Sequence, residues 1–129
     1  MMPDTTALSY VRLYTDPNGV SHFADEAFEL RSGSDRGQGV LAAYPIPNVE
    51  SASYVALKSG VVADWHTAPR RQFIICLTGE AEFIAGSGDV RSLKPGDVIL
   101  VEDTTGKGHI TRSVGREDHI AMVVPVPQR

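Results

Sequence analysis

The chain has 129 residues, a formal net charge of −4 and a single cysteine, and hydrophobic residues make up 42% of it. This length and apolar fraction predict one folded domain with one core rather than two domains or a disordered chain. The acidic balance excludes a protein that binds a nucleic-acid backbone, which presents a basic face, and a single cysteine excludes an internal disulfide. The sequence has no apolar stretch of membrane-span length and no signal-peptide pattern at its start, so we expect a cytoplasmic protein that binds neither nucleic acid nor membranes.

Turn signals recur along the chain at intervals typical of β-proteins. The first is Asp16-Pro-Asn-Gly19, in which proline fixes φ and glycine accepts a positive φ. A strand is predicted before it at 8–14, whereas the segment after it is ambiguous and includes a weak helical candidate at 25–30. The polar, glycine-rich segment 31–39 is predicted to be a loop. Further predicted strands are 40–44, 51–57, 72–77, 80–85, 90–93, 98–101, 109–114 and 119–126.

This pattern of about nine or ten short strands, with turns roughly every 8–12 residues, is typical of an all-β sandwich or barrel. The segment 72–77 is apolar without alternation, which predicts a strand buried on both faces. Cys76 lies in it and is expected to be a small buried hydrophobe. One face of this strand can fill a barrel, and the other needs cover from the same chain or from a partner chain. We expect short N-terminal strands within 8–45 to extend the sheets or a dimer interface.

The sequence resembles the cupin family in the spacing of two motifs. In the first motif, Gly60, His66, Gln72 and Gly79 stand at the expected intervals. Ala68 replaces the second histidine of that motif, and Gln72 replaces its glutamate. The first motif therefore keeps its glycines and one histidine but lacks two of the family's usual metal ligands.

In the second motif, Gly96-Asp97 and His109 match the family pattern, and Glu102 stands near the expected proline. The resemblance covers about residues 50–125. It implies a single jelly-roll barrel domain over residues 1–129, the double-stranded β-helix of cupins, with a pocket inside the barrel and frequently a homodimer. It does not imply one reaction, because this fold hosts many unrelated activities.

Two histidines on different strands of this pattern are expected to point into the barrel. His66 and His109, with Gln72 as a third donor, are the candidate ligands of a divalent metal such as Zn, Fe, Ni or Mn. Catalytic metal sites usually take three protein ligands, and a neutral amide is a poorer ligand than a carboxylate. A metal site and a metal-free cavity that binds a small molecule therefore both remain open.

The same residues are candidates for acid/base catalysis. His66 or His109 would transfer a proton, and Glu102 or Asp103 would act as a base or orient the imidazole. Glu102 and Asp103 are adjacent, so in a strand they point to opposite faces and cannot act together as a carboxylate pair. We name His66, His109 and Glu102 as the candidate catalytic residues.

Several other side chains are expected outside the site. Trp65 should point away from its neighbour His66 because strand residues alternate. Arg70 and Arg71 are expected to be solvated, with a substrate carboxylate as the alternative partner of one of them. Lys107 is expected to be a solubilising loop residue, and His119 is expected to be exposed.

Three functions remain open on this sequence. The first is a metal-dependent lyase, isomerase or dioxygenase that acts on a small organic molecule. The second is a metal-independent acid/base enzyme, and the third is a module that binds a small molecule without turnover. No organic cofactor is expected, since the chain has neither a phosphate-binding glycine loop nor a nucleophile elbow.

Overall fold

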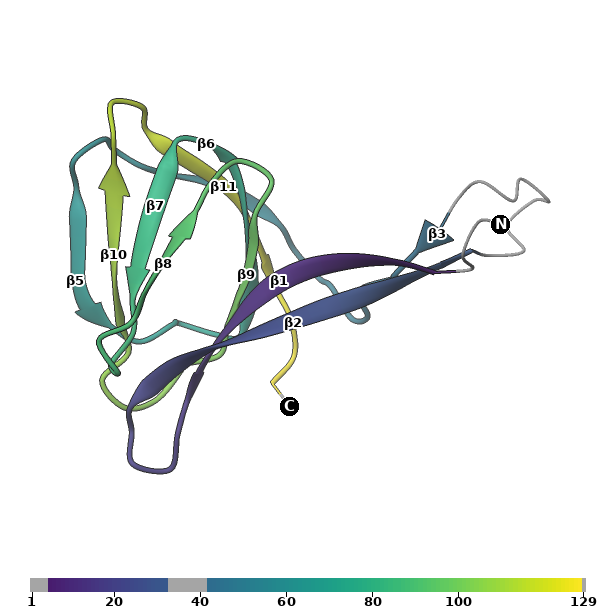
Figure 1. The fold of residues 1–129 in the computed structure, drawn as a ribbon, viewed down its shortest axis with the longest axis horizontal. Coiled ribbons are helices and arrows are strands. Elements are labelled where there is room, and N and C mark those ends of the chain that lie inside the picture. The colour runs from purple at the N-terminus through teal and green to yellow at the C-terminus, as the bar shows by residue number, and fades with distance from the viewer. Residues whose placement is uncertain (1–4, 33–41, 129) are drawn as a thin grey trace.

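The structure is a computed structural model that describes residues 5–32 and 42–128, and these residues form two β-sheets (Figure 1). The larger sheet has the order β3-β2-β1-β9-β6-β11-β4, and the smaller has the order β5-β10-β7-β8. Within the described residues no helix has the length and apolar character that a membrane span requires. The turn spacing predicted an all-β sandwich or barrel, and the resemblance implied a jelly-roll barrel; the all-β class is confirmed, and the two sheets are consistent with the jelly roll. The strands are β1 (Thr5–Thr15), β2 (Ser21–Ser32), β3 (Ala42–Ala43), β4 (Ser53–Leu57), β5 (Val62–His66), β6 (Gln72–Thr78), β7 (Glu80–Ile84), β8 (Val90–Leu93), β9 (Val98–Val101), β10 (His109–Val114) and β11 (His119–Pro125).

The N-terminal strands form a hairpin that is longer than predicted and extends away from the barrel (Figure 1). Its turn is the predicted one: Asp16 Oδ1 accepts the backbone N–H groups of Asn18 and Val20, and Gly19 has a φ of 82°. The weak helical candidate at 25–30 is part of β2. Its ladder with β1 is continuous, so cross-strand pairing overrides the local propensity. Most of the predicted loop at 31–39 lies outside the described residues.

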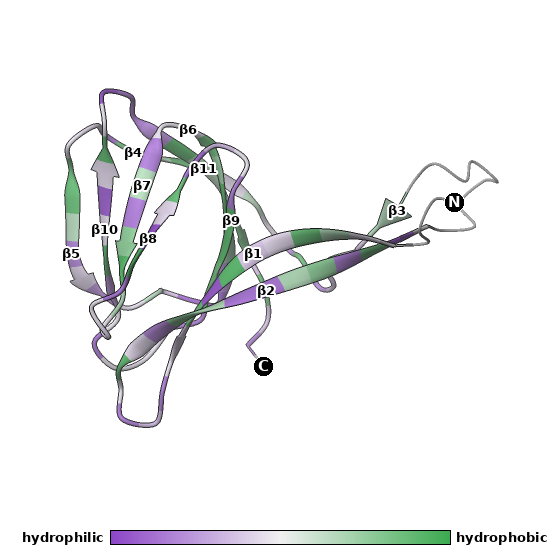
Figure 2. Ribbon diagram, viewed as in Figure 1, coloured by the Kyte–Doolittle hydropathy of each residue, from purple (hydrophilic) through white to green (hydrophobic). Residues whose placement is uncertain are grey.

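The strand β6 divides the apolar side chains into two clusters because its side chains alternate between the two faces of the larger sheet. Cys76 and Ile74 belong to a cluster between the two sheets. Phe73 and Ile75 belong to a second cluster on the outer face of the larger sheet. The neighbouring strand β9 is hydrophobic along its length (Figure 2) and contributes to both clusters.

The N-terminal hairpin of the same chain covers the outer face of β6. Tyr10 on β1 stacks on Phe28 of β2, with ring centroids 4.1 Å apart. Both rings pack on Phe73, at 6.0 Å and 5.5 Å. The second face of β6 is therefore buried without a partner chain, and the expected homodimer stays a prediction.

We predict that removing the Phe73 ring destabilises the protein strongly, because it lies between the hairpin and the sheet and is 5% exposed. Phe73→Ala should lower the free energy of unfolding by about 3–5 kcal/mol, measured by urea denaturation. Tyr54→Ala is the control: that ring is 72% exposed on β4, so its loss should cost less than about 0.5 kcal/mol. Equal losses in the two variants would contradict this view of the outer core.

Candidate functional site

A cavity of about 240 Å³ lies between the two sheets. Its walls come from β4, β6, β9 and β11 of the larger sheet and from β5, β7 and β10 of the smaller one, and most of the lining side chains are apolar. The strands β4 and β5 are edge strands of their sheets. Val55 and His66 on these two edges are exposed, so the cavity opens to solvent between them.

The structure brings His66 and His109 together in this cavity. Both residues line it, and they lie opposite each other in the antiparallel pair of β5 and β10. The ring centroids are 4.5 Å apart, and the ring planes are inclined by 56°. His66 stands at the exposed mouth, whereas His109 is 3% exposed. The two imidazoles therefore form one polar site that runs from solvent into the barrel.

The glycine before His109 permits this close approach of the two strands. Gly108 has a φ of 78°, in the left-handed region. A Cβ at this position would lie 2.0 Å from the carbonyl oxygen of His66. Any side chain here would force β5 away from β10 at the point where the two imidazoles meet.

Hydrogen bonds at the two Nδ1 atoms orient the rings. His109 Nδ1 donates to Asp103 Oδ2 at 2.5 Å, and His66 Nδ1 donates to the backbone carbonyl of Asp64 at 2.6 Å. A carbonyl oxygen only accepts, and an ionised carboxylate does the same, so each neutral ring carries its proton on Nδ1. No described residue hydrogen-bonds either Nε2 atom. Each Nε2 lone pair is therefore available to a ligand in the cavity.

Asp103 is buried completely at 0% exposure. Its backbone carbonyl accepts the N–H of Ala68 at 3.1 Å, and its Oδ2 accepts from His109. Among the described residues its Oδ1 has no hydrogen-bond partner. A buried carboxylate is costly unless a donor faces it, and the bond to His109 Nδ1 supplies that donor and fixes the orientation of the imidazole.

The predicted catalytic residue Glu102 lies on the opposite side of the strand end. Its carboxylate binds Arg12 of β1 and accepts from Arg71 Nε at 2.5 Å, and it does not line the cavity. The adjacent-residue alternation that the sequence predicted therefore places Asp103, not Glu102, beside His109. Arg71 is held by this ion pair and by the carbonyl of Pro127.

The donors in the cavity do not fit a resident divalent metal. Gln72 also lines the cavity, and as a third donor beside His66 and His109 it offers only a neutral amide. The described part of the chain contains no group of three His, Cys, Asp or Glu side chains that could hold a metal ion. Ala68, at the position where the family motif has a second histidine, is 3% exposed and packs in the inner core. The site therefore lacks the three strong ligands that catalytic metals usually take.

A third histidine lines the same cavity, and sequence reasoning missed it. His119 was expected to be exposed, but it is 5% exposed, because β11 begins at this residue. Its Nδ1 lies 3.5 Å from Cys76 Sγ. Burial lowers the pKa of His119 below its ordinary value and raises the pKa of the Cys76 thiol. The signal was present in the alternation of His119 with Ala121 and Val123, which also line the cavity.

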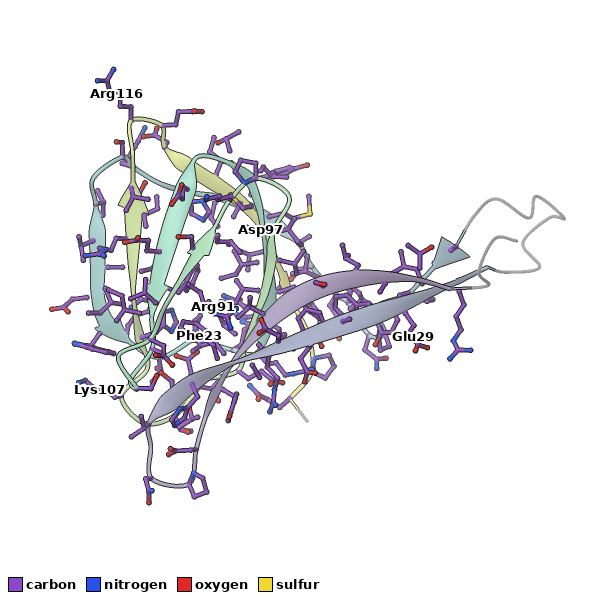
Figure 3. All side chains as sticks on the ribbon, viewed as in Figure 1. Phe23, Glu29, Arg91, Asp97, Lys107 and Arg116 are labelled. Carbon is purple, nitrogen blue, oxygen red and sulfur yellow. The ribbon has the colours of Figure 1, made fainter. Side chains whose placement is uncertain are left out.

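The remaining candidates lie outside the cavity, as expected. Lys107 lies at the end of the barrel where β5 ends (Figure 3), with its Nζ 4.0 Å from the centroid of the Trp65 ring. Neither side chain lines the cavity. Arg70 is exposed, and the prediction that it is solvated is confirmed. Within the described residues, the titratable side chains that line this cavity are the three imidazoles.

No protein-family model and no curated protein matches the chain. Similar solved structures include a conserved protein of unknown function from Streptococcus pyogenes, with 19% identity over 60% of this chain and 65% of that chain, and a TM-score of 0.48. They also include a cupin 2 conserved barrel domain protein from Salinispora arenicola CNS-205, with 24% identity over 77% of this chain and 88% of that chain, and a TM-score of 0.48. A third is the Cnp3 cupin domain of Schizosaccharomyces pombe, with 10% identity over 98% of this chain and 86% of that chain, and a TM-score of 0.47.

Cupin barrels are thus among the structures that this fold resembles, as the two sequence motifs predict. The chain spans 65% of the length of the Streptococcus pyogenes protein. Identities below 25% and TM-scores below 0.5 carry no argument about ligand or activity, so the function proposed for this chain rests on its own residues.

We predict that Gly108→Ala separates the two imidazoles. The control is Gly88→Ala, because Gly88 also has a positive φ, 94°, but its Cβ would meet nothing within 4 Å. Both variants should lose about 1 kcal/mol of stability from backbone strain. Gly108→Ala should lose more stability than Gly88→Ala, and it alone should change the NMR signals of both His66 and His109. An undisturbed pair of imidazole signals in Gly108→Ala would contradict the close approach described above.

The burial of His119 predicts a pH dependence of stability. Its pKa is lowered in the folded state, so the unfolded chain binds more protons once the pH falls below about 6.5. The stability associated with neutral His119 is present above that pH and is lost as the pH falls through the folded-state pKa. The free energy of unfolding, measured from about pH 8 to about pH 5, should fall more in the wild type than in His119→Gln. Parallel pH profiles would show that His119 is not buried as a neutral ring.

Proposed function

We propose that this chain transfers protons on a small organic molecule bound between its two sheets, without a metal ion. The observation that carries the proposal is the buried hydrogen bond from His109 Nδ1 to Asp103 Oδ2, in a residue that lines the cavity and whose Nε2 has no hydrogen-bond partner among the described residues. A base needs a lone pair directed at the ligand and a partner that stabilises the proton it takes up. His109 and Asp103 supply these two features within an apolar enclosure.

The chemical step is a proton transfer with no change of oxidation state. An acidic C–H or O–H bond of the ligand breaks, an N–H bond forms at His109 Nε2, and the electron pair stays on the ligand. The resulting imidazolium is stabilised by the Asp103 carboxylate. The proton then returns to the same atom or to another atom of the ligand, which gives exchange or tautomerisation. His66, at the exposed mouth, exchanges protons with water.

The donor set favours this reaction over metal catalysis. A metal would need a third strong ligand beside His66 and His109. Gln72 offers only a neutral amide oxygen, and the described residues contain no third His, Cys, Asp or Glu side chain grouped with this pair. Proton transfer needs only the imidazoles that line the cavity and the Asp103 carboxylate that is hydrogen-bonded to His109 behind it. A binding module without turnover would use the same cavity, and the experiment below separates it from an enzyme.

The proposal is tested by hydrogen–deuterium exchange on a panel of small cyclic ketones in D₂O, followed by NMR. Proton abstraction next to the carbonyl forms an enolate, and return of a deuteron labels that carbon. The wild type should exchange at least one ketone faster than buffer does. His109→Gln should lower this rate about 100-fold or to the buffer rate, and Asp103→Asn should lower it about 10-fold or more.

Two controls complete this experiment. His22→Gln changes a histidine that binds Asp16 at the turn of the N-terminal hairpin, outside the cavity, and should exchange at the wild-type rate. Treatment with a metal chelator should also leave the rate unchanged. The proposal is wrong if the wild type exchanges no member of the panel, if the chelator abolishes exchange, or if His109→Gln exchanges as fast as the wild type.

A further inference from the structure

We infer that the ligand of this cavity is an uncharged molecule with one ring, which carries the hydroxyl group of a phenol or an enol. That hydroxyl donates its one hydrogen bond to Nε2 of His109. This inference rests on the proposed function and specifies the class of ligand that its cavity binds: the enol that proton abstraction forms from a ketone, or a phenol of the same shape. Three features of the cavity lead to it: its volume, the charge of its lining, and the hydrogen-bonding direction of its imidazoles.

The volume limits the ligand to one ring. The cavity has about 240 Å³, whereas an apolar protein cavity of about 150 Å³ binds benzene and drug-sized ligands need about 300–1,000 Å³. A single ring with one or two substituents therefore fits, and a fused or linked pair of rings does not. Phe83 lines the cavity with its ring 5.6 Å from that of His109, which provides a flat aromatic contact beside the polar site.

The charge of the lining excludes an anionic ligand. None of the described lining side chains is a lysine or an arginine. Arg71, the arginine that precedes the lining residue Gln72, is already paired with Glu102 outside the cavity. The buried Asp103 carboxylate lies behind His109 and would repel a carboxylate or phosphate bound at this end. An uncharged ligand needs no positively charged side chain to pair with it, and the Asp103 carboxylate does not repel it.

The imidazoles determine which polar group the ligand carries. Both Nδ1 atoms are used as donors to Asp103 and to the carbonyl of Asp64, so both Nε2 atoms accept hydrogen bonds. A ligand that only accepts, such as an ether or a ketone, leaves these atoms unpaired, which is costly in an apolar cavity, so the cavity should bind an enol more tightly than the ketone from which it forms. A phenol or enol hydroxyl is a strong donor, and an enol is also the product of proton abstraction next to a carbonyl. The imidazole that accepts the hydrogen bond of the enol hydroxyl is therefore the same group that would form the enol by removing a proton from the ketone.

Binding of matched probes tests this inference by calorimetry or NMR titration. The reference probe is 4-methylphenol, and 1,4-dimethylbenzene has the same shape with a methyl group in place of the hydroxyl. The compound 4-methylbenzoate adds a negative charge, and 4-phenylphenol adds a second ring. The wild type should bind 4-methylphenol about 10-fold more tightly than 1,4-dimethylbenzene, as one hydrogen bond allows. The other two probes should bind more weakly than 4-methylphenol.

Variants show whether the hydroxyl contacts the His109 imidazole. His109→Leu should bind 1,4-dimethylbenzene as the wild type does, which also proves that the variant is folded, and should lose the preference for 4-methylphenol. His22→Leu removes a histidine outside the cavity and should keep that preference.

Failure of this inference and failure of the proposed function give different results. The ligand class is overturned if 4-methylphenol does not bind, if it binds no better than 1,4-dimethylbenzene, or if 4-methylbenzoate or 4-phenylphenol binds more tightly. Ketone exchange that depends on His109 would then leave the proposed function standing. A preference for the phenol that depends on His109, without exchange of any ketone, would support the ligand class and overturn the proposed enzyme.

Discussion

The hydrogen bond between the buried Asp103 carboxylate and His109 is the interaction on which the site depends. A carboxylate with 0% exposure is costly unless a donor or a positive charge faces it, and His109 Nδ1 supplies that donor. The bond in turn decides which nitrogen of His109 faces the cavity. Loss of the carboxylate would leave the ring free to take the other tautomer, with a donor where the proposed chemistry needs an acceptor.

The chain holds Asp103 in place through backbone contacts with segments distant in sequence. The backbone N–H of Glu102 donates to the carbonyl of Leu13 on β1 at 2.7 Å, and the Asp103 carbonyl accepts the N–H of Ala68. Further along, Gly106 approaches Gly19 so closely that a Cβ would lie 2.4 Å from the Gly19 carbonyl oxygen. The turn of the N-terminal hairpin therefore braces the segment that connects Asp103 to His109.

The hairpin thus has two structural roles that meet at the site. Its aromatic residues Tyr10 and Phe28 cover the outer face of β6, and its Arg12 binds Glu102 beside the cavity. The ion pairs of Glu102 with Arg12 and Arg71 also keep these charges outside the barrel. The cavity that results has an apolar lining, and the buried charge of Asp103 is directed at one imidazole. Such an enclosure strengthens a hydrogen bond or a proton transfer at His109, because little water competes for it.

The sequence by itself determined the all-β class, most strand positions, the turn at 16–19 and the pair His66 and His109, because alternation, turn residues and motif spacing are local properties of the chain. It also determined that Glu102 and Asp103 point to opposite faces. Only the tertiary structure decided which of them faces His109, since that depends on how the strand end packs between β1 and the segment at Ala68. The burial of His119 and the long pairing of β1 with β2 were likewise decided by partners far along the chain, whose contacts a local pattern does not encode.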